Sequence, residues 1–287
     1  MTLFPKSLPD PSLDADVAAA LAGDRDALER VVRAVQPMVH RLALRFFGCP
    51  SHADDATQEA LVQVVTRLDR FAGRSAFTTW VYRVATNKFL SMARSPAERE
   101  AMTVEQFDDD LAPTAAPAAG EGASDLDRQM TLAEIRIGCT LAMLLCLDRD
   151  ARMAYILGAI AELDHQSAAA ILECSPAAYR KRLERARDDI TRLMRARCGV
   201  FDPAGEKCRC HLRVPMATTR GHLVPERLLF ATSREQVRQF PEVLMHIRRL
   251  KEVQRAAAIY QTHPDPVARV DFATRLHEIL DDRGLAG

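Results

Sequence analysis

Apolar residues recur three and four positions apart along most of this chain, and strand-like alternation is almost absent. This spacing is typical of amphipathic helices, in which the buried face repeats about every 3.6 residues. We therefore expect an all-α fold. Because the chain has 287 residues, several small helical cores are more plausible than one large core.

Breaks in the periodicity divide the chain into four predicted parts. Residues 1–94 and 131–197 are predicted to be two small helical domains. Residues 95–130 contain nine acidic and two basic residues together with Pro, Gly and Ala, a composition that predicts an acidic flexible linker. Residues 198–287 are predicted to be a cysteine-containing helical extension.

Composition limits the class of protein. Lys and Arg together number 39, as do Asp and Glu, so attraction to nucleic acid must come from local charge. No segment approaches the roughly 20 apolar residues that span a bilayer, and no export signal is recognisable, so we expect a cytoplasmic protein without a membrane partner. Seven cysteines in such a chain favour free thiols or a metal site over a disulfide framework.

Residues 166–172 and 176–194 form a predicted helix-turn-helix. Ser175 is placed to cap the second helix, and Pro176 occupies its first turn, where a missing N–H has no cost. The face of this helix opposite its apolar stripe carries small and then basic residues. They are Ala177, Ala178, Lys181 and Arg185, with Arg182 on the flank. Such a helix suits the major groove, where arginine contacts guanine. A solvated basic surface helix is the alternative.

Residues 71–94 interleave aromatic and basic side chains, among them the single Trp. Unstacked DNA bases can stack on aromatic rings while cations hold the backbone, so this block is suited to single-stranded DNA. Trp80 also has the spacing of a core residue, and packing is an equal alternative. In the helix predicted after residue 55, Gln58, Glu59 and Gln63 form a polar face that is free for a partner.

Four blocks of the sequence resemble the extracytoplasmic-function (ECF) sigma factors of bacterial RNA polymerase. They are GDRDALERVV at 23–32, ADDATQEALVQV at 53–64, FAGRSAFTTWVYRVATNKFL at 71–90 and SPAAYRKRLERAR at 175–187. The resemblance implies an alternative sigma factor that directs core RNA polymerase to promoter DNA and initiates transcription. It also implies that residues 1–94 are sigma region 2 and residues 131–197 are sigma region 4.

The resemblance implies roles for individual residues. The polymerase-binding residues would be Asp54, Asp55, Gln58 and Glu59. The residues that melt and read the −10 element would include Arg74, Trp80, Arg83, Asn87 and Lys88. The residues that read the −35 element would include Ala178, Arg180, Lys181, Arg182 and Arg185.

The extension begins with a cysteine cluster. Cys198, Cys208 and Cys210 are spaced as C-x9-C-x-C, and His211 follows directly. Three thiolates and one imidazole would satisfy tetrahedral zinc, although no cofactor is required for the implied function. A reversible thiol switch and incidental thiols are the alternatives. The stretch RCGVFDPAGEKCRC also resembles a cysteine motif found after the second domain in one subgroup of these sigma factors. The other cysteines, Cys49, Cys139, Cys146 and Cys174, are predicted to be small core residues.

The apolar stripe of residues 240–260 must pack against another element. We hypothesise that the extension covers part of both sigma domains and adjusts polymerase or promoter access in place of an anti-sigma factor. Whether a separate anti-sigma factor exists stays open. The alternative function is a metal- or redox-responsive helix-turn-helix regulator that does not serve polymerase. No phosphate loop, paired-carboxylate group or nucleophile motif stands out, so an enzyme is not expected.

Overall fold

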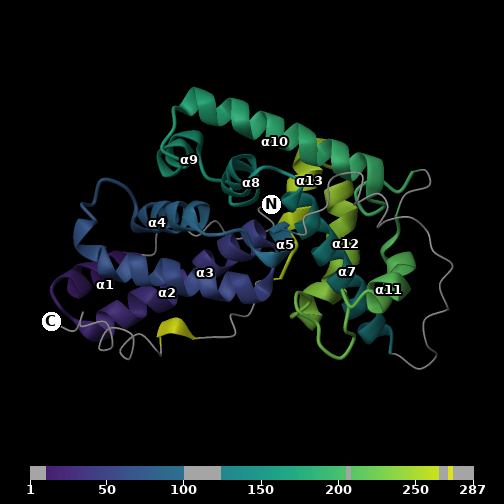
Figure 1. The fold of residues 1–287 in the computed structure, drawn as a ribbon, viewed down its shortest axis with the longest axis horizontal. Coiled ribbons are helices and arrows are strands. Elements are labelled where there is room, and N and C mark those ends of the chain that lie inside the picture. The colour runs from purple at the N-terminus through teal and green to yellow at the C-terminus, as the bar shows by residue number, and fades with distance from the viewer. Residues whose placement is uncertain (1–10, 100–123, 205–207, 265–270, 274–287) are drawn as a thin grey trace. The chain divides into compact units, whose positions relative to one another are not determined.

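The structure, a computed structural model, describes residues 11–99, 124–204, 208–264 and 271–273. Within these ranges the regular structure is helical apart from one isolated β-bridge, which confirms the all-α prediction (Figure 1). The first elements are α1 (Pro11–Leu21), α2 (Arg25–Phe47), α3 (Pro50–Thr66), η1 (Leu68–Arg70), α4 (Phe77–Ser91) and α5 (Pro96–Arg99). They are followed by α7 (Asp125–Leu145), α8 (Arg149–Tyr155), the π-helical η2 (Ile156–Ile160), α9 (His165–Ile171) and α10 (Pro176–Arg197). The last are α11 (Cys210–Thr219), α12 (Arg234–Arg248) and α13 (Glu252–Gln261).

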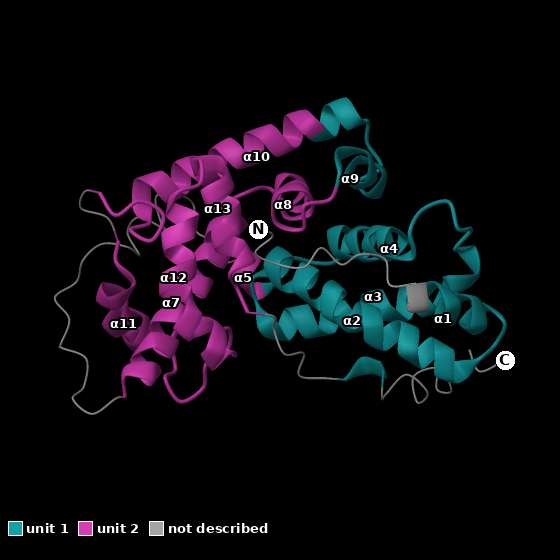
Figure 2. Cartoon of the chain, turned by 180° about the vertical axis from the view of Figure 1, so that it is seen from behind, with its two compact units in different colours: residues 1–95, 164–179, 266–287 teal, residues 96–163, 180–265 magenta. Residues whose placement is uncertain are grey.

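The chain divides into two compact units, coloured separately in Figure 2. Unit 1 contains residues 1–95, 164–179 and 266–287, and unit 2 contains residues 96–163 and 180–265. None of the helices in the described ranges has a stretch long and apolar enough to cross a bilayer.

Unit 1 is built around α2, α3 and α4. The Asp24 side chain caps α2 by accepting from the Ala27 backbone N at 3.0 Å. Gly48 ends the helix with φ 66°, a left-handed conformation that favours glycine, and Pro50 then starts α3. The buried faces meet in an aromatic core in which Phe47 contacts Phe46 edge-on at 4.9 Å between ring centroids.

In unit 2, α7 is the central element. It starts at Asp125, inside the range predicted as linker, because Ser124 caps it by accepting from the Asp127 backbone N at 3.1 Å. Residues 100–123 of the predicted linker lie outside the described residues. Helices α11 and α12 pack on α7, and α13 packs on η2. The stripe predicted over residues 240–260 is divided between α12 and α13, which are separate helices.

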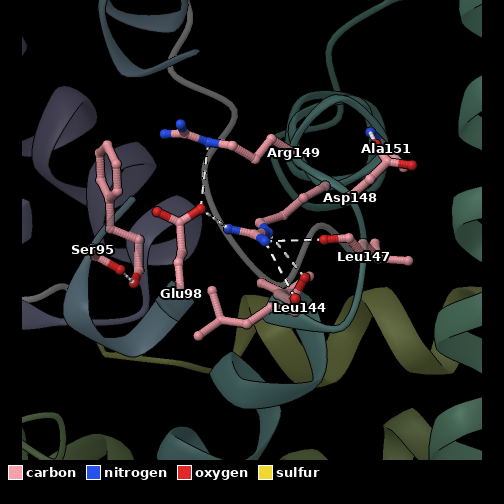
Figure 3. Close-up of polar contacts among 10 residues, drawn as sticks. Ser95, Glu98, Leu144, Leu147, Asp148, Arg149 and Ala151 are labelled. Atoms are coloured by element: carbon pink, nitrogen blue, oxygen red, sulfur yellow. Dashed lines mark hydrogen bonds and ion pairs between the residues drawn. The ribbon is translucent and has the colours of Figure 1, made fainter. Parts of the chain in front are cut away.

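A buried ion pair joins α5 to α8 within unit 2 (Figure 3). The Arg152 guanidinium lies 2.7 Å from Glu98 Oε1, and Arg149 Nε lies 3.4 Å from the same oxygen. Arg152 also donates to the backbone carbonyls of Leu144 and Leu147, both at 3.0 Å. Burial lowers the pKa of Arg152, and the Glu98 carboxylate opposes this shift.

Candidate nucleic-acid interface

The helix-turn-helix forms at the predicted residues, as α9 and α10. Asp164 caps α9 by accepting from the backbone N of Gln166 and Ser167 at 3.0 and 2.9 Å. A hydrogen bond from the Ser167 side chain is the largest cause that lowers the pKa of Asp164, and the two backbone hydrogen bonds lower it further. Ser175 caps α10 by accepting from the Ala178 backbone N at 3.2 Å, as its position in the sequence predicts.

The apolar stripe of α10 is buried and its basic face is open. The buried residues are Tyr179, Leu183, Ala186, Ile190 and Leu193. The exposed residues are Ala178, Arg180, Lys181 and Arg185. Arg182 is half-buried, and its guanidinium lies 3.5 Å from the Asp150 carboxylate of α8. Four of the five residues implied for −35 recognition therefore face solvent, and the fifth also serves an ion pair inside unit 2.

Trp80 belongs to an aromatic cluster at the start of α4. Its ring stacks on Phe77 with 5.6 Å between centroids and lies 5.7 Å from Phe71. Phe77 is buried, whereas Trp80 and Phe71 are each partly exposed. Trp80 thus packs against Phe77 as its core spacing predicts, while part of its side chain stays accessible.

The basic and amide side chains around α4 differ in their surroundings. Arg74 is exposed in the loop before α4. Arg83 is half-buried, and its Nε has no hydrogen-bond partner. Asn87 Nδ2 donates to Glu173 Oε1 at 3.0 Å, and Glu173 lies in the turn of the helix-turn-helix with φ 51°. Lys88 forms an ion pair with Glu59 of α3.

The four residues of α3 implied for polymerase binding are not equally accessible. Asp55 and Glu59 are exposed, and Gln58 is half-buried. The Asp54 side chain is only 12% exposed, and its Oδ1 lies 2.9 Å from Nε2 of the buried His40. Asp54 is therefore held against the core of unit 1, whereas its neighbour Asp55 presents its carboxylate to solvent.

The cysteine cluster includes a residue that the sequence did not single out. Cys198, Cys208 and Cys210 line an internal cavity of ≈ 20 Å³ together with Cys139 of α7. His211 is exposed and does not line this cavity. Burial is the largest cause that raises the pKa of the Cys139 thiol and of the Cys210 thiol, each to about 12. No group of three or more His, Cys, Asp or Glu side chains in the described residues is arranged to hold a metal ion.

Within unit 2, polar contacts that no short motif predicts hold residues of the extension against α7. The buried Glu134 carboxylate of α7 accepts from the backbone N of Leu229, Phe230 and Ala231 at 2.7 to 2.8 Å. In addition, Thr140 O accepts from the Tyr260 hydroxyl at 3.0 Å. In the sequence, Glu134 is only an acidic residue within a predicted helix. Its role could not be predicted, because its backbone partners are about a hundred residues away.

The end of the described extension contacts α2 in unit 1. Asp271 lies 2.9 Å from the Arg33 guanidinium, and the Phe272 backbone N donates to Gln36 Oε1 at 3.2 Å. Phe272 and Ala273 are buried. The extension thus contacts elements of both predicted sigma domains, α7 in unit 2 and α2 in unit 1.

Comparison with known proteins agrees with this geometry. The family models Sigma-70 region 2 and Sigma-70, region 4 match residues 31–99 and 137–190. The ECF RNA polymerase sigma-E factor of Escherichia coli (strain K12) is 31% identical over 175 residues, which cover 58% of this chain and 86% of that protein. The RNA polymerase sigma-H factor of Pseudomonas aeruginosa is 28% identical over 180 residues, 60% of this chain and 88% of that protein.

Two solved structures are also similar over part of the chain. One is CnrH in complex with the cytosolic domain of CnrY, with a TM-score of 0.44, 24% identity and coverage of 63% of this chain and 96% of that chain. The other is the sigma factor RpoE in complex with the anti-sigma factor NepR from Bartonella quintana, with a TM-score of 0.41, 23% identity and coverage of 58% and 95%.

The matched regions account for α2 to α4 and for the helix-turn-helix, and they disfavour a regulator that does not serve polymerase. The family-model matches end at residue 190, before the cysteine cluster and the helices behind it. This chain belongs to the ECF sigma factor family and is an alternative sigma factor that directs RNA polymerase to promoters.

Proposed function

We propose that α10 reads the −35 element through its exposed basic face and that α4 with its preceding loop reads the −10 element. The observation that carries the proposal is the accessibility of Arg180, Lys181 and Arg185 just after the capped start of α10. A helix presented in this way can place its first turns in the major groove while its bases contact guanine edges and phosphates. The Arg182 contribution would be smaller, because Asp150 already neutralises part of its charge.

For the −10 element, we assign base stacking to Trp80 and backbone contacts to the neighbouring cations. The partly exposed indole is held from behind by Phe77, so it forms a rigid surface on which an unstacked base can lie. Asn87 and Lys88 are engaged with Glu173 and Glu59. DNA would therefore replace an internal carboxylate at each of these two side chains when it binds.

On α3, the exposed Asp55 and Glu59 would bind polymerase directly, with Gln58 beside them. Asp54 would act through position instead, because its contact with His40 holds the start of α3 against α2. Polymerase that binds at Glu59 would compete with Lys88 for the same carboxylate. The release of Lys88 on polymerase binding would then provide a cation for promoter DNA. The protein would act in the cytoplasm, where RNA polymerase and promoter DNA are found.

The extension is proposed to regulate this activity. Its contacts with α7 and with α2 mean that a change in the extension can alter elements in both units. This supports an intramolecular regulator in place of a separate anti-sigma protein. Removal of the whole extension would be a poor test, because it would strip the buried Glu134 of its three backbone donors.

The DNA assignment is tested by run-off transcription with core RNA polymerase and a selected pool of promoters. Wild-type protein is expected to start RNA synthesis at a subset that shares a −10 and a −35 element. The Lys181→Ala and Arg185→Ala variants should lose promoter-specific product while still binding core polymerase. If wild-type protein bound the polymerase but every α10 variant transcribed the same promoters equally well, the assignment of α10 would be wrong.

The regulatory role is tested by release of the end of the extension. Arg33→Ala removes the partner of Asp271 and also an exposed pair with Glu29. Arg30→Ala, on the same helix α2, removes an exposed pair with Asp16 of α1 and is the control. If the extension restrains the sigma domains, Arg33→Ala should raise transcription in the assay above and Arg30→Ala should not. Equal transcription by both variants and the wild type would contradict restraint through this contact.

A further inference from the structure

The cavity in unit 2 brings together four thiols from three separate segments. Cys139 lies in α7, and Cys198 follows the last residue of α10. Cys210 is the first residue of α11, and Cys208 lies two residues before it. The cavity volume of ≈ 20 Å³ is small and its walls also include Arg136. None of the four thiols forms a disulfide, and each cysteine is partly buried.

The backbone fixes two of these cysteines side by side. Cys198 and Cys208 form a parallel β-bridge, in which Gly199 N donates to Cys208 O at 3.0 Å and Cys208 N donates to Arg197 O at 3.1 Å. A Cβ on Gly199 would lie 2.7 Å from Cys208 O, so only glycine permits this approach. The close pairing therefore depends on the residue that follows Cys198.

A buried cation borders the cavity without a carboxylate partner in the described hydrogen bonds and ion pairs. Arg136 is 8% exposed, its Nε has no hydrogen-bond partner, and its guanidinium carbon lies 3.3 Å from the centroid of the Phe240 ring. Its electrostatic neighbours are the thiols of Cys210 and Cys198. Burial raises the pKa of the Cys139 and Cys208 thiols, and the charge of a second buried arginine, Arg213, opposes this shift.

Buried cations require nearby negative charge, which protonated thiols do not provide. Four thiolates around a divalent cation would carry two net negative charges, which would place negative charge beside the Arg136 guanidinium. Arg152 illustrates the alternative in the same unit, because it is neutralised by Glu98. The convergence of four thiols on one small cavity beside a buried arginine therefore favours a bound metal over four unligated thiols.

We propose that Cys139, Cys198, Cys208 and Cys210 bind one Zn²⁺ ion in a closed tetrahedral site. Each thiol would release its proton on binding, and the side chains would turn toward the cavity, because they are not yet arranged around a metal. A disulfide between Cys198 and Cys208 would supply no negative charge to Arg136, and partly buried thiols meet oxidants less readily than exposed ones. The site would join α7 and α10 to α11 of the extension.

Elemental analysis of the full chain, purified under reducing conditions and equilibrated with Zn²⁺, tests the site. We expect one zinc per chain, with four of the seven cysteines protected from alkylation until a chelator is added. Cobalt substitution should give the intense visible absorption of tetrahedral thiolate coordination. These wild-type measurements do not depend on whether any variant folds, and they are independent of transcription.

Variants then identify the ligands. Cys139→Ser and Cys210→Ser should lose the ion, whereas Cys49→Ser and Cys174→Ser, which do not line the cavity, should keep it. His211→Ala should also keep the ion and its cobalt spectrum. Arg136→Gln should weaken zinc affinity by about 10–100-fold, the usual effect of losing a group that supports the ligands.

Three outcomes would overturn the proposal. The first is a wild-type chain that neither retains zinc nor gains thiol protection from it. The second is loss of the ion in His211→Ala but not in Cys139→Ser, which would support the ligand set expected from the sequence. The third is a Cys198–Cys208 disulfide, seen as a loss of two hydrogens in the mass of metal-free protein, which would support a thiol switch.

Discussion

The arginines of α10 and the arginines inside unit 2 have the same side chain in opposite surroundings. Arg180 and Arg185 are solvated on an open helix face, whereas Arg136 and Arg152 are buried. Water stabilises the first pair, so their charge remains available to a phosphate or a guanine edge. A buried guanidinium requires compensation within the fold, and Arg152 receives it from Glu98 and three backbone carbonyls.

Arg136 differs from both groups. It has the burial of Arg152 without a carboxylate such as Glu98 in the described contacts, and it lies beside the thiols that line the cavity. Burial lowers its pKa to about 10. Exposure thus separates the arginines that we propose to act on DNA from the buried arginines of unit 2, and Arg136 borders the proposed zinc site.

The largest effect is expected from Glu98→Gln. This change leaves Arg152 and Arg149 without the carboxylate that neutralises them, and removal of one partner of a buried pair typically costs about 3–5 kcal/mol. We expect a large fall in Tm, measured by circular dichroism. The double variant Glu98→Leu with Arg152→Met should lose less stability than the two single changes combined, and a wild-type Tm for Glu98→Gln would contradict the proposed role of this pair.

The next effect concerns the exposed face of α10. Arg185→Ala should weaken promoter binding by about 1–3 kcal/mol, tenfold or more, if the guanidinium contacts a base. It should leave Tm unchanged, because the side chain is exposed. Arg192→Ala is the matched control on the same helix, since that exposed arginine pairs with Asp189 away from the start of α10. Equal losses of affinity in a fluorescence titration would mean that only overall charge matters.

A smaller effect is expected at the cap of α9. Asp164→Ala removes the acceptor of two backbone N–H groups, which typically costs about 1 kcal/mol, whereas Asp164→Asn should retain most of the cap. Since the folded pKa of Asp164 is below its ordinary value of 3.8, the charge-dependent stabilisation is complete above that value and is lost as pH falls through the folded pKa.

Urea denaturation of Asp164→Ala and wild-type protein should therefore show the full difference near neutral pH and a narrower one in acid. The Asn variant should show no such pH-dependent change relative to Ala. A difference from wild type that stayed constant down to low pH would show that the ionised carboxylate is not what stabilises α9.

The smallest effect is expected for Arg195→Ala. Its side chain is exposed and forms an ion pair with Glu252 of α13, and such pairs contribute little because water screens them. We expect no measurable change in Tm or in promoter binding. A clear loss of stability would mean that exposure is a poor guide to which arginines hold unit 2 together, and this would weaken the comparison above.

The sequence predicts the exposed half of this comparison well. The stripe from Tyr179 to Leu193 and the Ser175 cap depend on neighbours within a few turns, so periodicity and capping rules identify them. The buried half depends on residues distant in the chain. Cys139 meets Cys198 only after α7 and α10 have folded, and its position within a helical stripe is the same as that of an ordinary core residue.

Helix ends in the extension illustrate a second limit. Residues 240–260 have apolar periodicity throughout, yet α12 ends at Arg248 and α13 starts at Glu252 without a glycine or proline between them. Arg255 donates to the carbonyls of Arg248 and Leu250, which satisfies backbone groups at the break. The carbonyls at this break are thus satisfied by a side chain of the following helix, which no capping residue in the sequence indicates.

The Glu134 anchor has a consequence for how short this protein can be made. A chain ended at residue 197 would keep the carboxylate of α7 but none of the three backbone N–H groups that it accepts from. It would also uncover the face of α7 on which α11 and α12 pack. The smallest stable version of unit 2 would therefore have to extend past Ala231, well beyond residue 190, where the region 4 family match ends.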